Sequence, residues 1–409
     1  MQFRSIYLSY PTILSLIMAL ASVAHAKPCS GTRWSGPAWT TRSGCLAVPL
    51  NPADPESGSI RIYYEFSKPD GKSLGNLIVF HGGPAYPRRH LQSEGPLWSA
   101  LRSHYRILYF HQRGSGYSGR IAEAAELEGK DRFYSLDMIV HDCALLHQEL
   151  FPEQRVILLG KSAGGFIALK YALRYPEQVT RLILAATSPH HGYLSQRHRV
   201  EADFMASLEE RYEGYLDRYQ HAVAILDPGL LKSAPVLYKL LLKLDVLENV
   251  VFDLSYTLAG QREAVAVVQQ MSQQRFSLFL QRLESGRETL VLSGLESLPL
   301  LNRISCREFG FGDSSPTACT GVEADVLFDV RPELERLTMP TLVMSGRYDP
   351  ILPLEFQEAI ASRLSGNIIW HILDLSAHML FREQPRATTQ LVLDFLAVPH
   401  QQPAQVPGL

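Results

Sequence analysis

Short apolar runs followed by glycine-rich turns recur in the first half of the chain. The first strand expected is half-exposed, because its apolar residues alternate with polar ones, whereas the later runs are apolar throughout and suit strands buried on both faces. The expected strands are 60–66, 77–80, 105–110, 156–159 and 182–186, and the expected helices are 135–150 and 164–175. Strands and helices that alternate in this way predict an α/β fold, with a mostly parallel central sheet and helices on both faces.

The alternation stops near residue 187 and resumes near residue 338. The part between reads as helices and loops, so we expect 188–337 to be a mainly helical cap inserted between two strands of one sheet. The core would then consist of 27–187 and 338–398, and the cap would cover the catalytic end of the sheet. The tail 399–409 is rich in Pro and Gln, and we expect it to be disordered. The elements expected in the second part of the core are strands 341–345 and 368–373 and helices 354–363 and 386–396.

The N-terminus has the pattern of a secretory signal peptide over 1–26. Arg4 supplies a positive charge, 13–20 is apolar, and Ala24 and Ala26 form a small-x-small cleavage site. The mature chain would start near Lys27 in the periplasm or outside the cell of a bacterium. No cysteine stands at the cleavage point, so no lipid anchor is expected. The alternative is an N-terminal helix packed on the domain.

The composition is that of an ordinary globular protein with a nearly balanced charge. The chain has 409 residues, 46% of them hydrophobic, and a net charge of −2, which gives no reason to expect a nucleic-acid partner. The length suits one large domain with an insertion. The sequence does not set the oligomeric state.

The five cysteines suit an oxidising compartment. Cys29 lies close in sequence to Cys45, and Cys306 to Cys319, each in a segment of Gly, Ser, Thr and Pro where a loop can close. We expect these two disulfides, although five cysteines allow other pairings. Cys143 lies on the apolar stripe of helix 135–150 and is expected to be a buried free thiol.

The clearest chemical signal is the sequence GKSAG around Ser162. It matches G-x-S-x-G between a buried strand and a helix, where a tight turn exposes the serine hydroxyl. A plain strand-to-helix turn is the alternative. The sequence predicts that Ser162 is a nucleophile, and a serine hydroxyl needs a base to take its proton.

His378 is the expected base, because it lies in a loop after a strand late in the chain. Asp349, just after strand 341–345, would hold the imidazole in the correct tautomer. The order Ser162, Asp349, His378 is the one used by hydrolases with this type of serine turn. Asp374 is a second candidate for the acid.

Two backbone N–H groups are expected to stabilise the oxyanion. One belongs to Ala163, next to the nucleophile, and the other to Gly83, in the turn after strand 77–80, with Gly82 close behind. The ring of His81 would hold this turn. The sequence has no metal-binding H-E-x-x-H and no dinucleotide motif, so no metal or cofactor is expected.

Three motifs together resemble the proline iminopeptidase and tripeptidyl-aminopeptidase family of α/β-hydrolases. They are HGGP at 81–84, QRGSGYS at 112–118 and GKSAGG at 160–165, and the resemblance covers 60–190 and 338–398. It implies an α/β-hydrolase fold and release of an N-terminal residue, often proline, from a peptide.

The sequence departs from the family pattern beside these motifs. The Asp that usually precedes Gln-Arg-Gly is His111 here, and we expect that position mainly to hold its loop. The residues next to the nucleophile are usually bulky or aromatic, whereas here they are Lys161 and Ala163. These differences leave the substrate class open.

An aminopeptidase must also recognise a free ammonium group, and an acidic residue of the cap would do so. Glu308 resembles part of a Cys-x-Glu segment of relatives, which makes it the candidate, and a disulfide between Cys306 and Cys319 would hold it rigidly. A solvated surface acid is the alternative.

The sequence therefore leads to an exported aminopeptidase as the first hypothesis. A carboxylic-ester hydrolase with the same three residues is the second, and a non-catalytic binding protein that kept the fold is the third.

Overall fold

A computed structural model of the protein describes most of the predicted core. The described residues are 29, 31–36, 38–83, 95–119, 124–191, 197–225, 251, 254–273, 278, 304, 306–308 and 327–397. The predicted signal peptide, 1–26, and the predicted disordered tail, 399–409, lie outside them.

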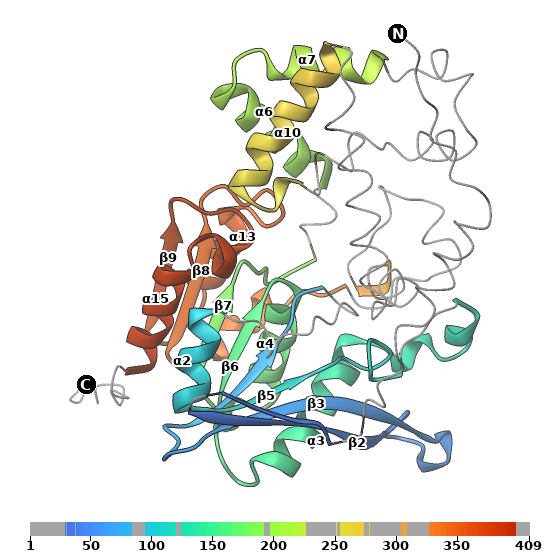
Figure 1. The fold of residues 1–409 in the computed structure, drawn as a ribbon. Coiled ribbons are helices and arrows are strands. Elements are labelled where there is room, and N and C mark those ends of the chain that lie inside the picture. Colours follow the sequence, from blue (N-terminus) through green and yellow to red (C-terminus); the bar gives the residue numbers. More distant parts are fainter. Residues whose placement is uncertain are drawn as a thin grey trace, which may run out of the picture.

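Nine strands form one sheet within the described residues, in the order β1-β2-β3-β5-β4-β6-β7-β8-β9. From β5 to β9 all neighbours are parallel, whereas β1, β2 and β3 extend the sheet in antiparallel fashion (Figure 1). The strands are β1 (Arg33–Gly36), β2 (Trp39–Pro49), β3 (Ser59–Pro69), β4 (Asn76–Phe80), β5 (Arg106–Phe110), β6 (Val156–Lys161), β7 (Val179–Ala185), β8 (Thr341–Gly346) and β9 (Ile368–Leu373).

The buried apolar runs of the sequence account for the middle of this sheet. Strands β4 and β8 are buried along their whole length, as expected of strands that helices cover on both faces. All seven predicted strands are confirmed. The chain leaves β4 toward β5 on one side, and β6 lies on the other side of β4. Ligands of open α/β sheets bind beyond the carboxyl ends of the strands at such a point.

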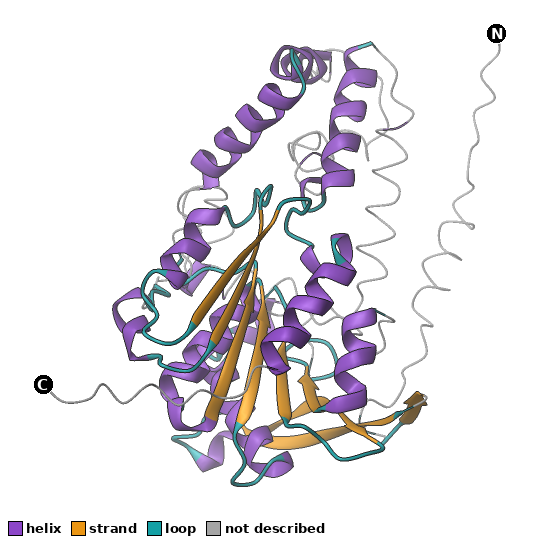
Figure 2. Cartoon of the chain, turned by 90° about the vertical axis from the view of Figure 1, so that its left-hand side faces the viewer, coloured by secondary structure: helices purple, strands orange, loops and turns teal. Residues whose placement is uncertain are grey.

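Helices cover both faces of the sheet (Figure 2). Helices α3 and α4 pack on one face, in an apolar cluster that includes Leu146 and Ile167, and α2 and α15 pack on the other, in a cluster that includes Leu101 and Phe395. The predicted helices in the core are confirmed, and α2 and α14 are additions. The core helices are α2 (Pro96–His104), α3 (Leu136–Leu150), α4 (Ala163–Arg174), α13 (Leu354–Ala361), α14 (Leu380–Glu383) and α15 (Pro385–Ala397). Short 3₁₀ helices span Pro55–Ser57, Ala124–Leu127, Asp131–Phe133, Pro176–Gln178 and Arg331–Arg336.

Between β7 and β8 the described chain is mainly helical. Helices α6 (Arg197–Arg211), α7 (Tyr215–Ile225) and α10 (Leu258–Ser272) pack around an apolar cluster of their own, which includes Leu208 and Met271. Figure 1 shows them beyond the carboxyl ends of β7 and β8. The boundaries 188 and 337 of the cap stay a prediction. Among the described residues, no helix is long and apolar enough to cross a membrane.

The structure pairs Cys29 with Cys45, which confirms one predicted disulfide. Cys306 is also disulfide-bonded, whereas Cys319 lies outside the described residues. Cys143 is a free, fully buried thiol, as predicted, and burial raises its pKa well above the ordinary value. A buried thiol with a raised pKa is a poor nucleophile, so Cys143 is part of the core.

Candidate active site

Ser162 stands in a sharp turn between β6 and α4. Its φ of 55° and ψ of −128° are a backbone conformation that residues other than glycine rarely adopt. Two hydrogen bonds hold it, one from its N–H to the Ala185 carbonyl oxygen at 2.9 Å and one from the Thr187 hydroxyl to its own carbonyl oxygen at 2.7 Å. The turn places the hydroxyl at the carboxyl end of β6.

The glycines around Ser162 are required by close packing. A Cβ on Gly160 would lie 2.6 Å from the Gly164 carbonyl oxygen, and one on Gly165 would lie 2.2 Å from the Thr187 hydroxyl. These distances are shorter than the non-bonded contacts that a Cβ atom makes in proteins, so no larger residue fits at either position. The sequence GKSAGG therefore follows from how tightly α4 lies against β6 and the turn after β7.

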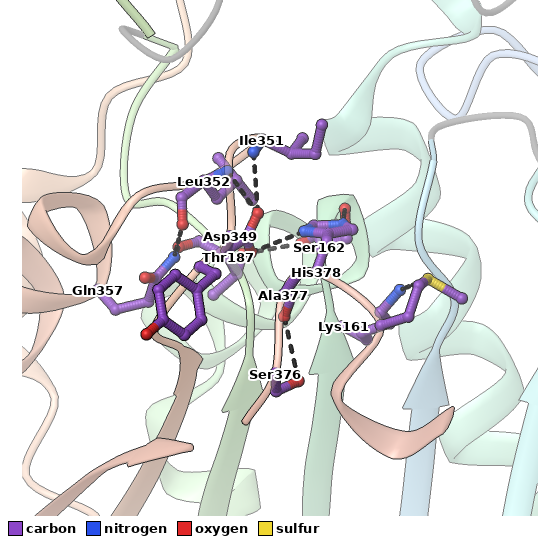
Figure 3. Close-up of polar contacts among 12 residues, drawn as sticks. Lys161, Ser162, Thr187, Asp349, Ile351, Leu352, Gln357, Ser376, Ala377 and His378 are labelled. Carbon is purple, nitrogen blue, oxygen red and sulfur yellow. Dashed lines mark hydrogen bonds and ion pairs between the residues drawn. The ribbon is translucent and has the colours of Figure 1, made fainter. Parts of the chain in front are cut away.

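The structure brings Ser162, His378 and Asp349 together (Figure 3). His378 Nε2 lies 3.1 Å from Ser162 Oγ, and His378 Nδ1 lies 2.8 Å from Asp349 Oδ2. His378 and Asp349 are 2% and 5% exposed, so little water competes for these contacts. A hydroxyl, an imidazole and a carboxylate joined in this order can move a proton from the hydroxyl to the ring.

Asp349 is held in place from both sides. Its Oδ1 accepts the N–H groups of Ile351 at 2.9 Å and Leu352 at 3.0 Å, which leaves Oδ2 for His378. The second candidate acid, Asp374, instead forms an exposed ion pair with Arg347, at 2.6 Å. The structure therefore places Asp349, and not Asp374, against the imidazole.

The turn after β4 lies directly against the serine. A Cβ on Gly82 would lie 3.1 Å from Ser162 Cβ, and Gly83 has a φ of +65°, which favours glycine. Ala163 is the first residue of α4, where an N–H has no acceptor within its helix. Ala163 and Gly82 thus flank Ser162, and the predicted Gly83 follows Gly82 in the same turn. His81 Nδ1 lies 3.1 Å from the Gly82 carbonyl oxygen of its own turn, to which an Nδ1–H group donates.

Two buried side chains hold the loop after β5. The Arg113 guanidinium donates to both carboxylate oxygens of Asp142, at 2.7 and 2.5 Å, and each residue is 1% exposed. His111 stands where the motif resemblance leads to the expectation of Asp, and its Nδ1 accepts the Tyr117 N–H at 3.1 Å. A carboxylate at this position could accept the same N–H, so the ring takes over the loop-holding contact expected of the acid.

The Glu308 side chain contacts the start of α3. Its Oε1 accepts the N–H of Leu136, the first residue of α3, at 2.8 Å. The residue keeps some solvent exposure, but protein surrounds its carboxyl group, and this burial raises the pKa of Glu308 to about 7, against the opposing effect of the Leu136 N–H. In this structure the carboxylate caps a helix. The predicted contact of this carboxylate with a substrate ammonium group stays a prediction.

Sequence reasoning missed several side-chain contacts around His378. The ring of Tyr256 meets the His378 imidazole edge-on, with centroids 5.4 Å apart, and Lys161 Nζ lies 3.1 Å from Met379 Sδ. Glu383 accepts hydrogen bonds from the His378 loop, and its place five residues after His378 was the one signal that could have pointed to it.

Comparisons with known proteins agree with this geometry. Residues 75–385 match the family described as alpha/beta hydrolase fold. A proline iminopeptidase of Saccharolobus solfataricus is 22% identical over 340 residues, which are 82% of this chain and 89% of that protein. Proline iminopeptidase PfmaB of Pestalotiopsis fici is 34% identical over 139 residues, 34% of this chain, and the match spans only 44% of that relative's length.

A solved structure from Mycobacterium tuberculosis is similar in fold, with a TM-score of 0.50 and 18% identity over 86% of this chain and 98% of that chain. The family match covers most of the sheet, both sheet faces and every loop that carries the candidate residues. The chain therefore belongs to the α/β-hydrolase family, as a hydrolase similar to proline iminopeptidases.

Proposed function

We propose that the protein is a serine hydrolase that forms an acyl-enzyme at Ser162. The observation that carries the proposal is the chain of hydrogen bonds from Ser162 Oγ through His378 to Asp349. His378 Nε2 takes the hydroxyl proton as Oγ attacks the substrate carbonyl carbon, and Asp349 stabilises the imidazolium that results.

The tetrahedral oxyanion then accepts hydrogen bonds from backbone N–H groups. Ala163 supplies one, and Gly83, with Gly82 beside it, supplies the other. When the intermediate collapses, His378 gives its proton to the leaving amine or alcohol. His378 then takes a proton from a water molecule, which attacks the acyl carbon. The ring gives this proton to Ser162 Oγ as the carboxylic acid leaves.

For the substrate we propose the N-terminal residue of a peptide, with proline as the first candidate. The similarity to proline iminopeptidases and the motifs HGGP and QRGSGYS support it. Purified protein should cleave prolyl or alanyl arylamides, and Ser162→Ala should reduce turnover by about 10⁴-fold or more. Full activity in that variant would contradict the mechanism.

A carboxylic-ester hydrolase is the second candidate, because the Glu308 carboxylate accepts the Leu136 N–H and caps a helix in this structure. The buried Ala163 also leaves the side of the nucleophile without a bulky residue. Turnover of nitrophenyl esters with none of any aminoacyl arylamide would favour this function. Glu308→Gln should then leave kcat/KM unchanged.

We also propose that the chain is exported and loses its signal peptide near Ala26. The disulfide between Cys29 and Cys45 supports an oxidising compartment, since such bonds are rare in the cytosol. Cell fractionation followed by N-terminal sequencing should find a chain that starts near Lys27. A cytoplasmic chain that keeps residues 1–26 would contradict the proposal.

A further inference from the structure

We propose that Glu383 is a positioning residue that fastens the start of α10 to the loop carrying His378, so that the cap side of the molecule sets the position of the base. This inference rests on the proposed serine mechanism. Glu383 touches neither Ser162 nor any reacting atom, and it acts only through the segments that its carboxylate joins.

The carboxylate of Glu383 accepts hydrogen bonds from two parts of the chain. Its Oε2 accepts the Ala377 N–H at 2.9 Å and the Ser376 hydroxyl at 3.2 Å, both in the loop just before His378. Its Oε1 accepts the Leu258 N–H at 2.7 Å. Residues 258 and 383 are 125 positions apart, so this contact joins the helical insertion to the core.

The Leu258 N–H is a natural partner for a carboxylate. Leu258 is the first residue of α10, after the N-cap Thr257, and a negative charge is stabilising at a helix N-terminus. On the other side of His378, the Met379 N–H donates to the Tyr256 carbonyl oxygen at 3.2 Å. The His378 loop is therefore tied to the segment before α10 on both sides of the base.

The same segment reaches the loop of the acid. The fully buried Gln261 amide donates to the Tyr348 carbonyl oxygen at 3.0 Å, directly before Asp349, and to the Ser255 carbonyl oxygen at 2.9 Å. Residues 255–261 thus contact both loops that follow β8 and β9. A shift of this segment would change the position of the base and of the acid together.

Loss of the Glu383 contacts should mainly slow the reaction of Ser162. His378 Nε2 must stay within hydrogen-bonding distance of the hydroxyl, and a misplacement of about 1 Å in such a site can reduce the rate by about 100-fold. We therefore expect Glu383→Gln to lower kcat by about 10- to 100-fold with little change in KM. Glutamine has the size of glutamate, but its NH₂ group would face the N–H of either Leu258 or Ala377. Two donors cannot form a hydrogen bond, so one of the two contacts is lost.

The experiment measures the rate at which a fluorophosphonate probe labels Ser162, together with kcat, KM and the melting temperature. Glu358→Gln, on the exposed side of α13, is the matched control and should label at the wild-type rate. If wild-type protein is not labelled, the serine mechanism itself fails. If wild type is labelled and folded Glu383→Gln matches its rate, the role of Glu383 is wrong.

A second variant removes the other end of the contact. Leu258→Pro removes the donor N–H and the Leu side chain. The helix should tolerate the change, because proline is favoured at the first position of a helix and Thr257 already has the extended backbone that precedes proline. Leu258→Ala keeps the N–H and is its control. We expect Leu258→Pro to label about 10- to 100-fold more slowly than Leu258→Ala.

The double variant decides between a shared contact and general damage. If Glu383 acts through Leu258, Leu258→Pro should slow labelling much less in the Glu383→Gln background than in wild type. Strictly multiplicative effects of the two changes on the labelling rate would overturn the proposal, even if each single variant is slow. Should Glu383→Gln fail to fold, equal labelling of Leu258→Pro and Leu258→Ala would overturn it.

Discussion

At the scale of single residues, Gly164 shows how little space separates α4 from the end of β4. A Cβ at this position would lie 2.2 Å from the Phe80 carbonyl oxygen and 2.6 Å from that of His81. Backbone atoms cannot move aside as a flexible side chain can. We expect Gly164→Ala to lower the melting temperature and to abolish fluorophosphonate labelling of Ser162, because forcing a methyl group into packed backbone costs about 1–3 kcal/mol or more.

The control for this prediction is Gly71→Ala. A Cβ on Gly71 would meet no atom within 4 Å, and its φ is not in the left-handed region. This variant should keep the wild-type melting temperature and labelling rate. Wild-type behaviour of Gly164→Ala would mean that α4 lies farther from β4 than the structure shows.

His111 gives a second prediction at this scale. Its Nδ1 accepts the Tyr117 N–H at 3.1 Å, and the Oδ1 of an asparagine would stand the same number of bonds from the backbone. His111→Asn should therefore keep labelling within a few-fold of wild type. His111→Phe keeps a ring that can stack on Tyr117 but has no acceptor. It therefore leaves the partly buried Tyr117 N–H unpaired, and such a loss costs up to about 1–3 kcal/mol.

The two variants should differ in melting temperature, which thermal unfolding monitored by circular dichroism can measure. We expect His111→Phe to have the lower melting temperature of the two variants and to be labelled more slowly by the fluorophosphonate probe. Equal stability of His111→Phe and His111→Asn would show that the ring contacts, and not the hydrogen bond, hold the loop.

At the scale of elements, the sequence predicted best those strands whose surroundings are uniform. Strands β4, β6 and β8 are covered on both faces, so they appear as unbroken apolar runs. Strand β2 was not predicted, because its buried positions include the polar Thr41 and Ser43 and no apolar alternation results. Helix α2 was missed as well, since only Leu97 and Leu101 mark its apolar face.

The same reasoning explains which parts of the candidate site the sequence could predict. Ser162, Asp349 and His378 each lie in a turn directly after a recognisable strand, so their meeting at one edge of the sheet follows from the topology. The contacts of Tyr256 and Glu308 depend on how segments far apart in sequence fold back on the core. No local pattern carries that information.

Glu308 and the start of α3 provide a prediction at this scale. Because burial raises its pKa to about 7, Glu308 binds a proton more tightly in the folded state than in the unfolded chain. Its contribution therefore favours folding at pH 5 and is lost as the pH rises toward 8. Glu308→Gln stays neutral and keeps an oxygen that can accept the Leu136 N–H. We expect this variant to gain stability relative to wild type as the pH rises from 5 to 8.

Urea unfolding at the two pH values measures this difference. Each unit by which the pKa rises is equivalent to about 1.4 kcal/mol, and the partial exposure of the residue should reduce the effect. Glu335→Gln, at an exposed position, is the control and should show no such change between the two pH values. A constant difference between Glu308→Gln and wild type would contradict the raised pKa.

At the scale of the whole molecule, two apolar clusters belong to the faces of the sheet and a third belongs to α6, α7 and α10. The chain passes between the sheet and this helical part at two neighbouring segments. The Val330 N–H donates to the Pro189 carbonyl oxygen at 2.9 Å, and the His191 N–H donates to the Phe328 carbonyl oxygen at 2.7 Å. Within the described residues, α6, α7 and α10 therefore have an apolar cluster separate from those of the sheet.

This arrangement predicts that the helical part can loosen while the sheet stays folded. Met271 is fully buried in the third cluster, and shortening such a side chain to alanine costs about 2–5 kcal/mol. In Met271→Ala we expect hydrogen exchange to speed up in α7 and α10 and to stay unchanged in β6 and β8, because regions with separate cores open separately.

The matched control removes a similar volume from the core of the sheet. Leu158→Ala, in β6, should speed exchange in the neighbouring strands and lower the temperature of global unfolding. Labelling of Ser162 should also slow in Met271→Ala, since α10 begins at the segment that contacts the His378 loop. If hydrogen exchange in Met271→Ala speeds up equally in the sheet and in the helices, the molecule unfolds as one unit. The predicted division into core and cap would then not correspond to separate units of stability.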